Sequence, residues 1–412
     1  MNSEQLRSKI SEALKQMNGV LPLYPCWVLR NNLPPGRRLK LNVHDLYPYG
    51  LAVGAVSERW IASTGKADNG KFTLENEGLS KIAMPDGTEV LLADAVDAAG
   101  DLILGPQTME TYGGMKAFAK LYDFSIPIPH HVHLMEKDSR LVGVPPKPEA
   151  YYFPEQLNAI NYGYMHTYFG LQPGTTKEDV IRCLETWGRF DGADILQLST
   201  AYRLKLGTGW DVPAGILHAP GSLVTYEPQY VSDTSLFFQS IDEDWNVDRK
   251  SLTKFLPLER ENDFEYIVSV LDWDANTDPD FKKKHYREPV PVTDETVMRE
   301  QGYVEKWVTY GSELFSAKEL TVLPGQSVVI RDSASYGLLM MEGIGSINGV
   351  RAVAPTCIRY GQLADDEFYV TRDAAVQGVR IVNESKHAPL VMLKNFGPDN
   401  EEALALKCRL GL

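Results

Sequence analysis

The first apolar pattern along the chain has the spacing of a helix. Asn2 occupies an expected N-cap position and Gln5 follows three residues later, the arrangement of a capping box. Apolar side chains spaced three or four residues apart share one face of a helix. The pattern predicts a short amphipathic helix over residues 3–17, packed on the outside of the fold. Its apolar face would consist of Leu6, Ile10, Leu14 and Met17.

Between residues 22 and 128 the pattern changes to short apolar runs broken by Gly, Pro, Asn and Asp. Runs bounded by turn-forming residues are typical of β-strands. His44 falls in one of these runs, where a lone histidine is more often structural than functional. We therefore expect a β-sheet domain whose strands include RLKLNVHDLYPYG, LAVGAV, TEVLLADAV and DLILG.

A small helical insertion is predicted near residues 155–190. Thr175 and Glu178 have the spacing of a capping box, and Gly188 ends the periodic stretch. The aromatic run before it, NAINYGYMHTYFG, contains Tyr164 and is interpreted either as insertion core or as the wall of a substrate site. The buried face of the helix would consist of Val180, Leu184 and Trp187.

The rest of the chain divides by composition. Residues 246–300 are charged and turn-rich and are expected to connect two domains. Residues 301–412 again alternate and turn in the manner of a β-barrel. The sequence thus predicts an N-terminal domain over residues 1–245, which includes the insertion, and a C-terminal β domain over residues 301–412.

Length, charge and cysteine content narrow the class of protein. A chain of 412 residues exceeds the roughly 100–200 residues of one domain, which favours two. The formal net charge of −14 argues against a nucleic-acid partner, which would need a basic face. No apolar run reaches the ~18 residues of a membrane span, and no signal core is seen, so we expect a cytoplasmic protein without a membrane partner. The four cysteines lack CxxC spacing, which argues against disulfides and thiolate metal sites.

Three histidines carry the main chemical signal. His131 and His133 are two residues apart in an alternating run, and a strand points such residues to one face. His218 follows a tight Pro213-Ala-Gly215 turn at the end of a later strand. Three imidazoles and a carboxylate from different strands form a typical ligand set for a divalent metal. The predicted ligands are His131, His133, Glu149 and His218.

These motifs resemble those of a known family. Gly207, Pro213, Gly215 and His218 match the second cupin signature, whereas the first signature is met only in its His-x-His core. AFAKLYDFSIPIPHHVH, then Lys147-Pro148-Glu149, then VPAGILHA resemble class I mannose-6-phosphate isomerases over roughly residues 110–240. The resemblance implies a mainly β fold of two cupin (jelly-roll) barrels, of which the C-terminal one is degenerate and metal-free. It also selects Glu149 as the acidic ligand, although Glu136 is closer in sequence.

The resemblance further implies an activity. Family members hold zinc and interconvert aldoses and ketoses through a metal-stabilised enediolate. Lys147 and Glu227 occupy the positions of two pocket residues of that family. Where the family has a substrate-binding Arg, this chain has Phe237. Either another cation, Arg203 or Lys205, takes that role, or the substrate carries no phosphate, or the isomerase activity has been lost.

Several alternatives stay open at this point. The ligand set suits manganese, iron, nickel or cobalt as well as zinc. A metal-dependent cupin oxygenase and a non-catalytic carbohydrate-binding cupin are the competing functions. The expected small-molecule partner is a sugar or a sugar phosphate, and a homodimer is left open. His130, one residue out of phase with the pair, is expected to point away from the cavity.

Overall fold

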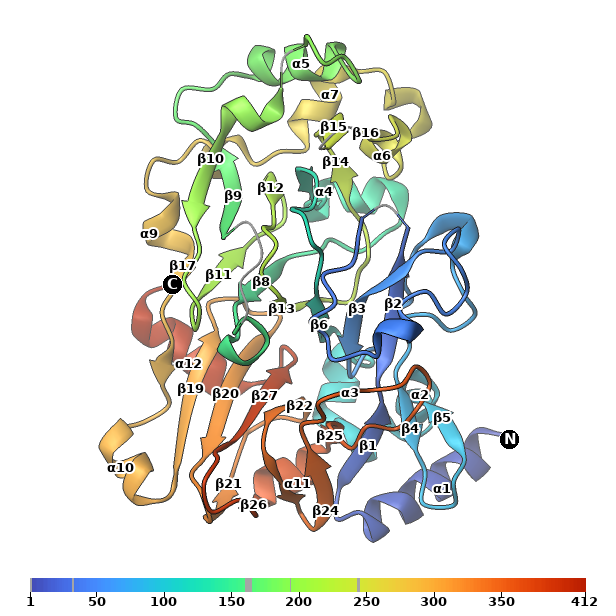
Figure 1. Cartoon of the computed structure of the whole chain (residues 1–412), viewed down its shortest axis with the longest axis vertical. Helices are drawn as coiled ribbons and strands as arrows, with labels where there is room; N and C mark the ends of the chain where they lie inside the picture. Colours follow the sequence, from blue (N-terminus) through green and yellow to red (C-terminus); the bar gives the residue numbers. More distant parts are fainter. Residues whose placement is uncertain (1, 32, 160–164, 193, 243–244) are drawn as a thin grey trace.

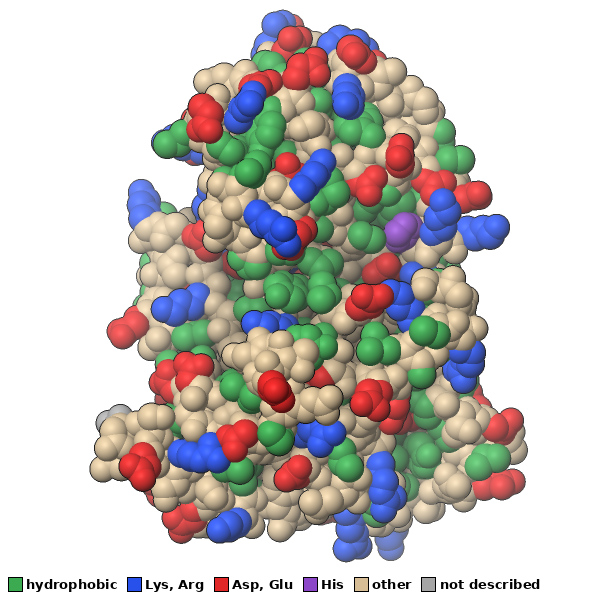
Figure 2. Space-filling model, turned by 180° about the vertical axis from the view of Figure 1, so that it is seen from behind, with side chains coloured by type: hydrophobic (Ala, Val, Ile, Leu, Met, Phe, Trp, Pro, Cys, Tyr) green, Lys and Arg blue, Asp and Glu red, His purple; other side chains and the backbone are tan. Residues whose placement is uncertain are grey.

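The computed structural model describes residues 2–31, 33–159, 165–192, 194–242 and 245–412. Antiparallel sheets dominate both halves of the elongated molecule, and an N-terminal helix lies at its edge (Figure 1). This mainly β architecture is the one expected from the sequence. The face seen in Figure 2 mixes acidic and basic side chains without a continuous basic area. Among the described residues, no helix is both long enough and apolar enough to cross a bilayer.

The first pair of sheets encloses an aromatic core. Phe169 of one sheet lies against Tyr151 and Trp210 of the other, with ring centroids 5.9 and 4.9 Å apart. The seven-stranded sheet runs in the order β17 (Tyr286–Arg287), β11 (Gly209–Val212), β8 (Glu149–Tyr152), β13 (Thr225–Tyr230), β6 (Ala117–Tyr122), β3 (Ala55–Ile61), β2 (Cys26–Arg30). The five-stranded sheet runs in the order β10 (Ser199–Arg203), β9 (His166–Leu171), β12 (His218–Ala219), β7 (His131–Val132), β14 (Leu236–Phe237).

The second pair of sheets encloses an apolar core that includes Leu320, Ile381 and Met392. Its larger sheet takes strands from both ends of the chain, since Val20 of β1 pairs with Val370 of β25. The nine strands are β18 (Val290–Pro291), β19 (Tyr303–Thr309), β20 (Ser316–Val322), β27 (Leu390–Phe396), β22 (Tyr336–Glu342), β25 (Glu367–Val370), β1 (Val20–Tyr24), β4 (Lys81–Ala83), β5 (Glu89–Leu91). The four facing strands are β21 (Ser327–Ile330), β26 (Val379–Asn383), β23 (Ile344–Ile347), β24 (Val350–Val353).

A third core joins the two halves. The outer faces of the two large sheets meet there, with Leu121 and Tyr226 of the first packed in one cluster with Leu339 and Leu393 of the second. Buried Arg59 crosses the same contact, 2.7 Å from Asp366 and 2.9 Å from Glu367. Because the pairing supplies hydrogen bonds as well as charge, the guanidinium is compensated despite its burial. The two halves therefore pack as one body.

The N-terminal helix is confirmed, and the region after β5 corrects the sequence interpretation. In α1 (Ser3–Gln16) the Gln5 backbone N–H donates to the Asn2 side chain at 2.9 Å, and the reciprocal bond is present. The runs TEVLLADAV and DLILG are not all strand, because helix α2 (Leu92–Ile103) begins directly after β5 and α3 (Pro106–Tyr112) follows. Apolar residues of α2 recur every three or four positions and are buried, which is the helical period. They are Leu92, Ala95, Val96, Ala99 and Ile103.

His44 is not in a strand. It lies in a single 3₁₀ turn, Val43–Asp45, and its side chain is exposed. The turn forms because the Asn42 side chain accepts the His44 backbone N–H at 3.0 Å. His44 therefore takes no part in a buried site.

Short helices cover the five-stranded sheet. The predicted helix is α5 (Lys177–Glu185), but its capping box is Thr176 with Asp179, one residue later than predicted. The interval expected to be a helical insertion also contains strand β9, at the centre of the sheet. Residues after 246 fold into helices, and Leu252 and Ile267 share a core with Val180.

The remaining helices are α4 (Glu136–Ser139), α6 (Lys250–Thr253), α7 (Phe264–Ser269), α8 (Trp273–Asn276), α9 (Phe281–His285), α10 (Glu295–Glu300), α11 (Arg372–Gln377), α12 (Glu401–Leu410).

Candidate metal centre

The structure brings the three predicted histidines together inside the first pair of sheets. His218 of β12 is the direct cross-strand partner of His131 of β7, and His133 follows two residues later. One ring nitrogen from each side chain lies within 4.8 Å of the others, and all three side chains are buried. The spacing of two residues places His131 and His133 on one face, as the strand period requires.

Each histidine is held in one tautomer by the backbone. A carbonyl oxygen can only accept, so each Nδ1 that contacts a carbonyl carries a proton, which leaves Nε2 as the ring nitrogen available to the cluster. The three Nδ1–carbonyl distances are 2.8 Å for His131 with Pro129, 2.6 Å for His133 with Thr234 and 2.8 Å for His218 with Ile216. Burial lowers the pKa of His131 well below its ordinary value. Burial and the charge of Lys147 lower the pKa of His133 to about 4. Neutral imidazoles with outward hydrogen bonds are the form that binds metals.

Glu149 reaches the cluster from strand β8 of the facing sheet. Its two carboxylate oxygens lie 3.1 Å from Nε2 of His133 and 3.1 Å from Nε2 of His218. Tyr151 donates its hydroxyl to the same carboxylate at 2.5 Å. Although burial favours the neutral acid, the charge of Lys147 holds the pKa of Glu149 well below its ordinary value. The ionised carboxylate of Glu149 therefore lies beside two of the three imidazoles that form the group able to hold a metal ion, and carboxylate oxygen and imidazole nitrogen are both donors that divalent cations accept.

The two neighbouring candidates lie elsewhere. His130 points away from the cluster, with Nδ1 3.1 Å from the Gln239 side chain and its ring against Tyr168. Glu136 is exposed at the start of α4 and forms an ion pair with Arg140 at 2.7 Å. Of the two acids considered from the sequence, the one in Lys-Pro-Glu is the one beside the histidines.

Lys147 and Glu227 adjoin the cluster. The Lys147 ammonium donates to Glu149 and lies 3.1 Å from both Glu227 Oε1 and His133 Nε2. Glu227 projects from β13 and is 2% exposed. Burial, and after it the charge of Glu149, raise the pKa of Glu227 to about 8. The structure therefore places an ammonium and a carboxyl group that can change protonation near neutral pH beside the candidate metal ligands.

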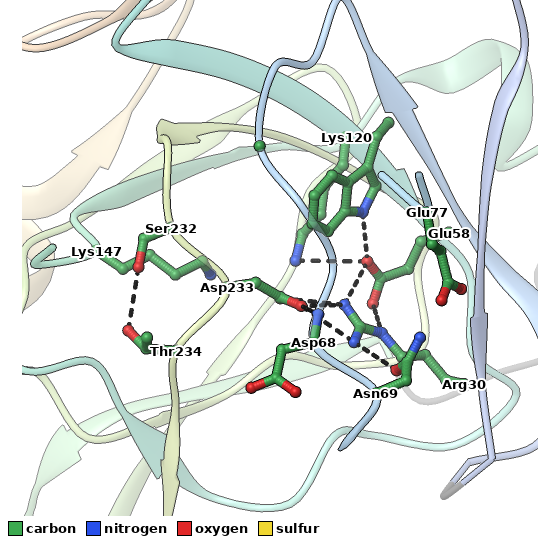
Figure 3. Close-up of polar contacts among 12 residues, drawn as sticks. Arg30, Glu58, Asp68, Asn69, Glu77, Lys120, Lys147, Ser232, Asp233 and Thr234 are labelled. Carbon is green, nitrogen blue, oxygen red and sulfur yellow. Dashed lines mark hydrogen bonds and ion pairs between the residues drawn. The ribbon is translucent and has the colours of Figure 1, made fainter. Parts of the chain in front are cut away.

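A row of charged side chains continues from Glu227 across the seven-stranded sheet. We call Glu227, Lys120, Glu58 and Arg30 the charged row, because the adjacent strands β13, β6, β3 and β2 supply one residue each. Lys120 Nζ lies 3.1 Å from Glu227. Figure 3 shows the other two contacts, in which Lys120 Nζ lies 3.8 Å and Arg30 Nε 2.8 Å from Glu58. Although burial favours neutral Glu58, the guanidinium of Arg30 lowers its pKa to about 2. Opposite charges on adjacent strands thus compensate one another.

The charged row was missed in the sequence, although a signal is present. Lys120 is a single charged residue inside the apolar run AFAKLY, and Glu58 stands next to Arg59 in the otherwise mostly apolar strand AVSERWI. Buried charges of this kind are rare unless paired. Which strand supplies the partner could not be read from the sequence.

The expected substrate-binding residues are not at the cluster. Arg203 is exposed at the end of β10, an edge strand two strands away from β12. Lys205 is exposed as well and forms an ion pair with Glu288 at 3.1 Å. Tyr164 lies outside the described residues. Phe237 of β14, by contrast, lies beside the cluster, with its ring centroid 5.6 Å from that of His131.

Comparison with known proteins identifies the fold. No protein-family model matches the chain, and no curated protein sequence matches it. Among solved structures, mannose 6-phosphate isomerase from Bacillus subtilis matches with a TM-score of 0.56 and 17% identity, covering 91% of this chain and 99% of that one. A point mutant of phosphomannose isomerase from Salmonella typhimurium matches at 0.59 and 12%, covering 92% and 100%. A mannose 6-phosphate isomerase bound with zinc and yttrium matches at 0.57 and 13%, covering 92% and 99%.

The class of protein follows from the fold and the cluster together. The chain is a cupin-type β protein with a buried three-histidine group suited to a metal. Its fold is that of the mannose-6-phosphate isomerases over most of its length, which confirms the resemblance drawn from the sequence motifs.

Proposed function

We propose that the protein is a metal-dependent aldose–ketose isomerase acting on a sugar or a sugar phosphate. The observation that carries the proposal is the buried position of Lys147, which contacts Glu227 on one side and the candidate ligands His133 and Glu149 on the other. Proton transfer between neighbouring carbons needs a group that gains and loses a proton beside the point where negative charge develops. Glu227 is the group that would gain and lose the proton, and Lys147 lies beside it where negative charge would develop.

His131, His133, Glu149 and His218 would hold the metal. The donors alone do not select a metal; zinc is favoured by the family resemblance, and a zinc-bound neighbour in the fold comparison supports that choice. Manganese, iron, nickel or cobalt would be accepted by the same donors. When bound, the cation would supply Lewis acidity to the oxygens on C1 and C2 of the sugar.

In this proposal Glu227 is the base. Its carboxylate takes the proton from C2 of the aldose and returns it to C1, while the hydroxyl proton of O2 passes to O1, so that C1 becomes an alcohol and C2 a ketone; the reverse reaction uses the same group. Lys147, 3.1 Å from Glu227, holds the carboxylate in place and donates to the substrate oxygen on which negative charge develops. Tyr151 orients Glu149 through its 2.5 Å hydrogen bond and so keeps the opposite side of the cluster rigid.

The test is exchange of the C2 hydrogen in deuterated water, followed by NMR on zinc- and manganese-loaded protein. A set of free aldoses and their terminal phosphates should include at least one that exchanges. Glu227→Gln and Lys147→Met should each lower the exchange rate by about 10²–10⁴-fold while the metal content stays that of the parent protein. Lys205→Met, an exposed lysine outside the cluster, is the matched control and should leave the rate unchanged. Full exchange by Glu227→Gln would refute the assignment of the base.

One observation favours a second candidate. Three imidazoles and a carboxylate also suit iron in an oxygenase. Oxygen uptake by iron-loaded protein with a sugar or polyol, in the absence of any C2 exchange, would establish that function instead. Metal and sugar binding without either reaction would indicate a carbohydrate-binding protein.

A further inference from the structure

We infer that the site takes an uncharged sugar and discriminates against its phosphate ester. This inference rests on the proposed function and specifies its substrate class. It is drawn from the charges around the cluster, each of which is already matched by an opposite charge.

Arg30 is the strongest anion-binding group of the charged row, and it has no donor left. A guanidinium has five N–H groups. Nε donates to Glu58 at 2.8 Å, Nη1 donates to Asn69 and Asp233 at 2.9 and 3.3 Å, and Nη2 donates to Glu58 and Asp233 at 3.1 Å each. Figure 3 shows the guanidinium between the two carboxylates. A phosphate could bind Arg30 only by displacing one of them.

The two lysines are engaged in the same way. Lys147 has three acceptors, namely Glu149, Glu227 and His133. Lys120 lies between Glu227 and Glu58 and is 7% exposed. If His133 and Glu149 serve as metal ligands, Lys147 still retains Glu227. Neither ammonium is free to neutralise a second anion.

The pairing of carboxylates with cations near the ligand cluster also leaves no cation for a phosphate. In the described part of the chain, four carboxylates of the cluster and the charged row, namely Glu149, Glu227, Glu58 and Asp233, are contacted by three cations. The residues outside the described ranges include no lysine or arginine. A phosphate monoester brings about −1.5 to −2 charges at neutral pH. Each of the three cations is already paired with at least one of the carboxylates, so a phosphate beside Phe237 would find no unpaired cation among them.

A neutral sugar meets none of these obstacles. Each hydroxyl both donates and accepts, so it can donate to a carboxylate and accept from a lysine without separating the ion pair. The charged row offers alternating acceptors and donors on neighbouring strands, starting at Glu227 beside the ligand cluster. Polyol hydroxyls are therefore the groups that these side chains can bind without losing an ion pair.

The experiment compares free aldohexoses and aldopentoses with their terminal phosphates on the metal-loaded protein. Two readouts are taken, C2 exchange in deuterated water and binding by calorimetry. We expect the free sugar to be favoured by about 100-fold or more in kcat/KM, the order of penalty for an uncompensated buried charge. A phosphate ester with the higher kcat/KM or the tighter binding would overturn the inference, and so would a lack of binding by both sugar classes.

The two readouts separate this inference from the proposed function. Absence of exchange in every sugar, with tighter binding of the free form, would refute the isomerase proposal and support the substrate class. Phe237→Arg supplies the missing cation next to His131 and should improve binding of the phosphate ester relative to the free sugar by at least about tenfold. Phe237→Leu, the matched control, should leave the ratio unchanged. Metal content is measured for each variant, and an unchanged ratio in metal-loaded Phe237→Arg would count against the inference.

Discussion

Replacing Lys120 by methionine removes a buried charge from between two carboxylates. Its Nζ lies 3.1 Å from Glu227 and 3.8 Å from Glu58, and its side chain is 9% exposed. At an effective dielectric constant of ~20, each attraction is roughly 4–5 kcal/mol before the cost of desolvation. Breaking a buried ion pair by deleting one partner costs about 3–5 kcal/mol, because the other charge is left uncompensated. We expect Lys120→Met to lower the free energy of unfolding by about 3 kcal/mol.

The loss should depend on pH in a defined direction. The pKa of Glu227 is already raised to about 8, and without Lys120 it would rise further. The folded variant then binds a proton at Glu227 that the unfolded chain, with an ordinary glutamate pKa, has released. The stability of the variant therefore decreases as pH rises above the ordinary pKa of glutamate. The loss of unfolding free energy caused by Lys120→Met should accordingly be larger at pH 8 than at pH 6.

The assay is equilibrium unfolding in guanidinium chloride. Lys81→Met is the matched control, since Lys81 forms a 2.8 Å ion pair with Glu89 in which both side chains are more than 40% exposed. That pair should contribute only about 0–1 kcal/mol. The double variant Lys120→Met/Glu227→Gln should recover part of the loss, because one uncompensated charge is removed. Equal losses for Lys120→Met and Lys81→Met would refute the reasoning.

Three further predictions concern the metal, the charged row and a helix cap. Removing bound metal with a chelator should lower the thermal midpoint of unfolding, and adding back Zn²⁺ should restore it, because a ligand that binds only the folded state stabilises that state. An unchanged midpoint in metal-free protein would contradict the proposed metal site. The pKa of Glu58 is depressed to about 2, so the stability that this carboxylate contributes is present above the ordinary glutamate pKa and is lost as pH falls from about 4.5 to about 2. Denaturant titrations in this pH window should therefore show a shallower pH dependence of unfolding free energy for Glu58→Gln than for the parent protein. Thr176→Ala should cost about 1 kcal/mol of unfolding free energy, whereas Thr175→Ala should cost little, which distinguishes the observed cap of α5 from the predicted one.

The histidine cluster could be predicted because its geometry is local. A spacing of two residues in a strand places His131 and His133 on one face, and the Pro213-Ala-Gly215 turn positions His218. Glu149 needed the additional resemblance, since Glu136 is closer to the two histidines along the chain. Its selection over Glu136 agrees with the observed geometry.

Other features depend on partners that are far away in sequence. The charged row exists because β2, β3, β6 and β13 are neighbours, a register that no single strand encodes. Helix α2 was taken for strands because short apolar runs have the same appearance in both elements, and only its burial at helical spacing resolves the choice. Arg203 and Lys205 were assigned by proximity in sequence, but Arg203 ends the edge strand β10, Lys205 lies in the loop after it, and both are exposed.

The most direct test of the central claim is metal stoichiometry. After equilibrium dialysis against Zn²⁺, elemental analysis should find one ion per chain in the parent protein and in His44→Ala, whose histidine is exposed in a surface turn. His133→Ala and His218→Ala should each retain much less than one ion. Equal zinc content in all four proteins, or no zinc in the parent, would contradict a single metal held by His131, His133, Glu149 and His218.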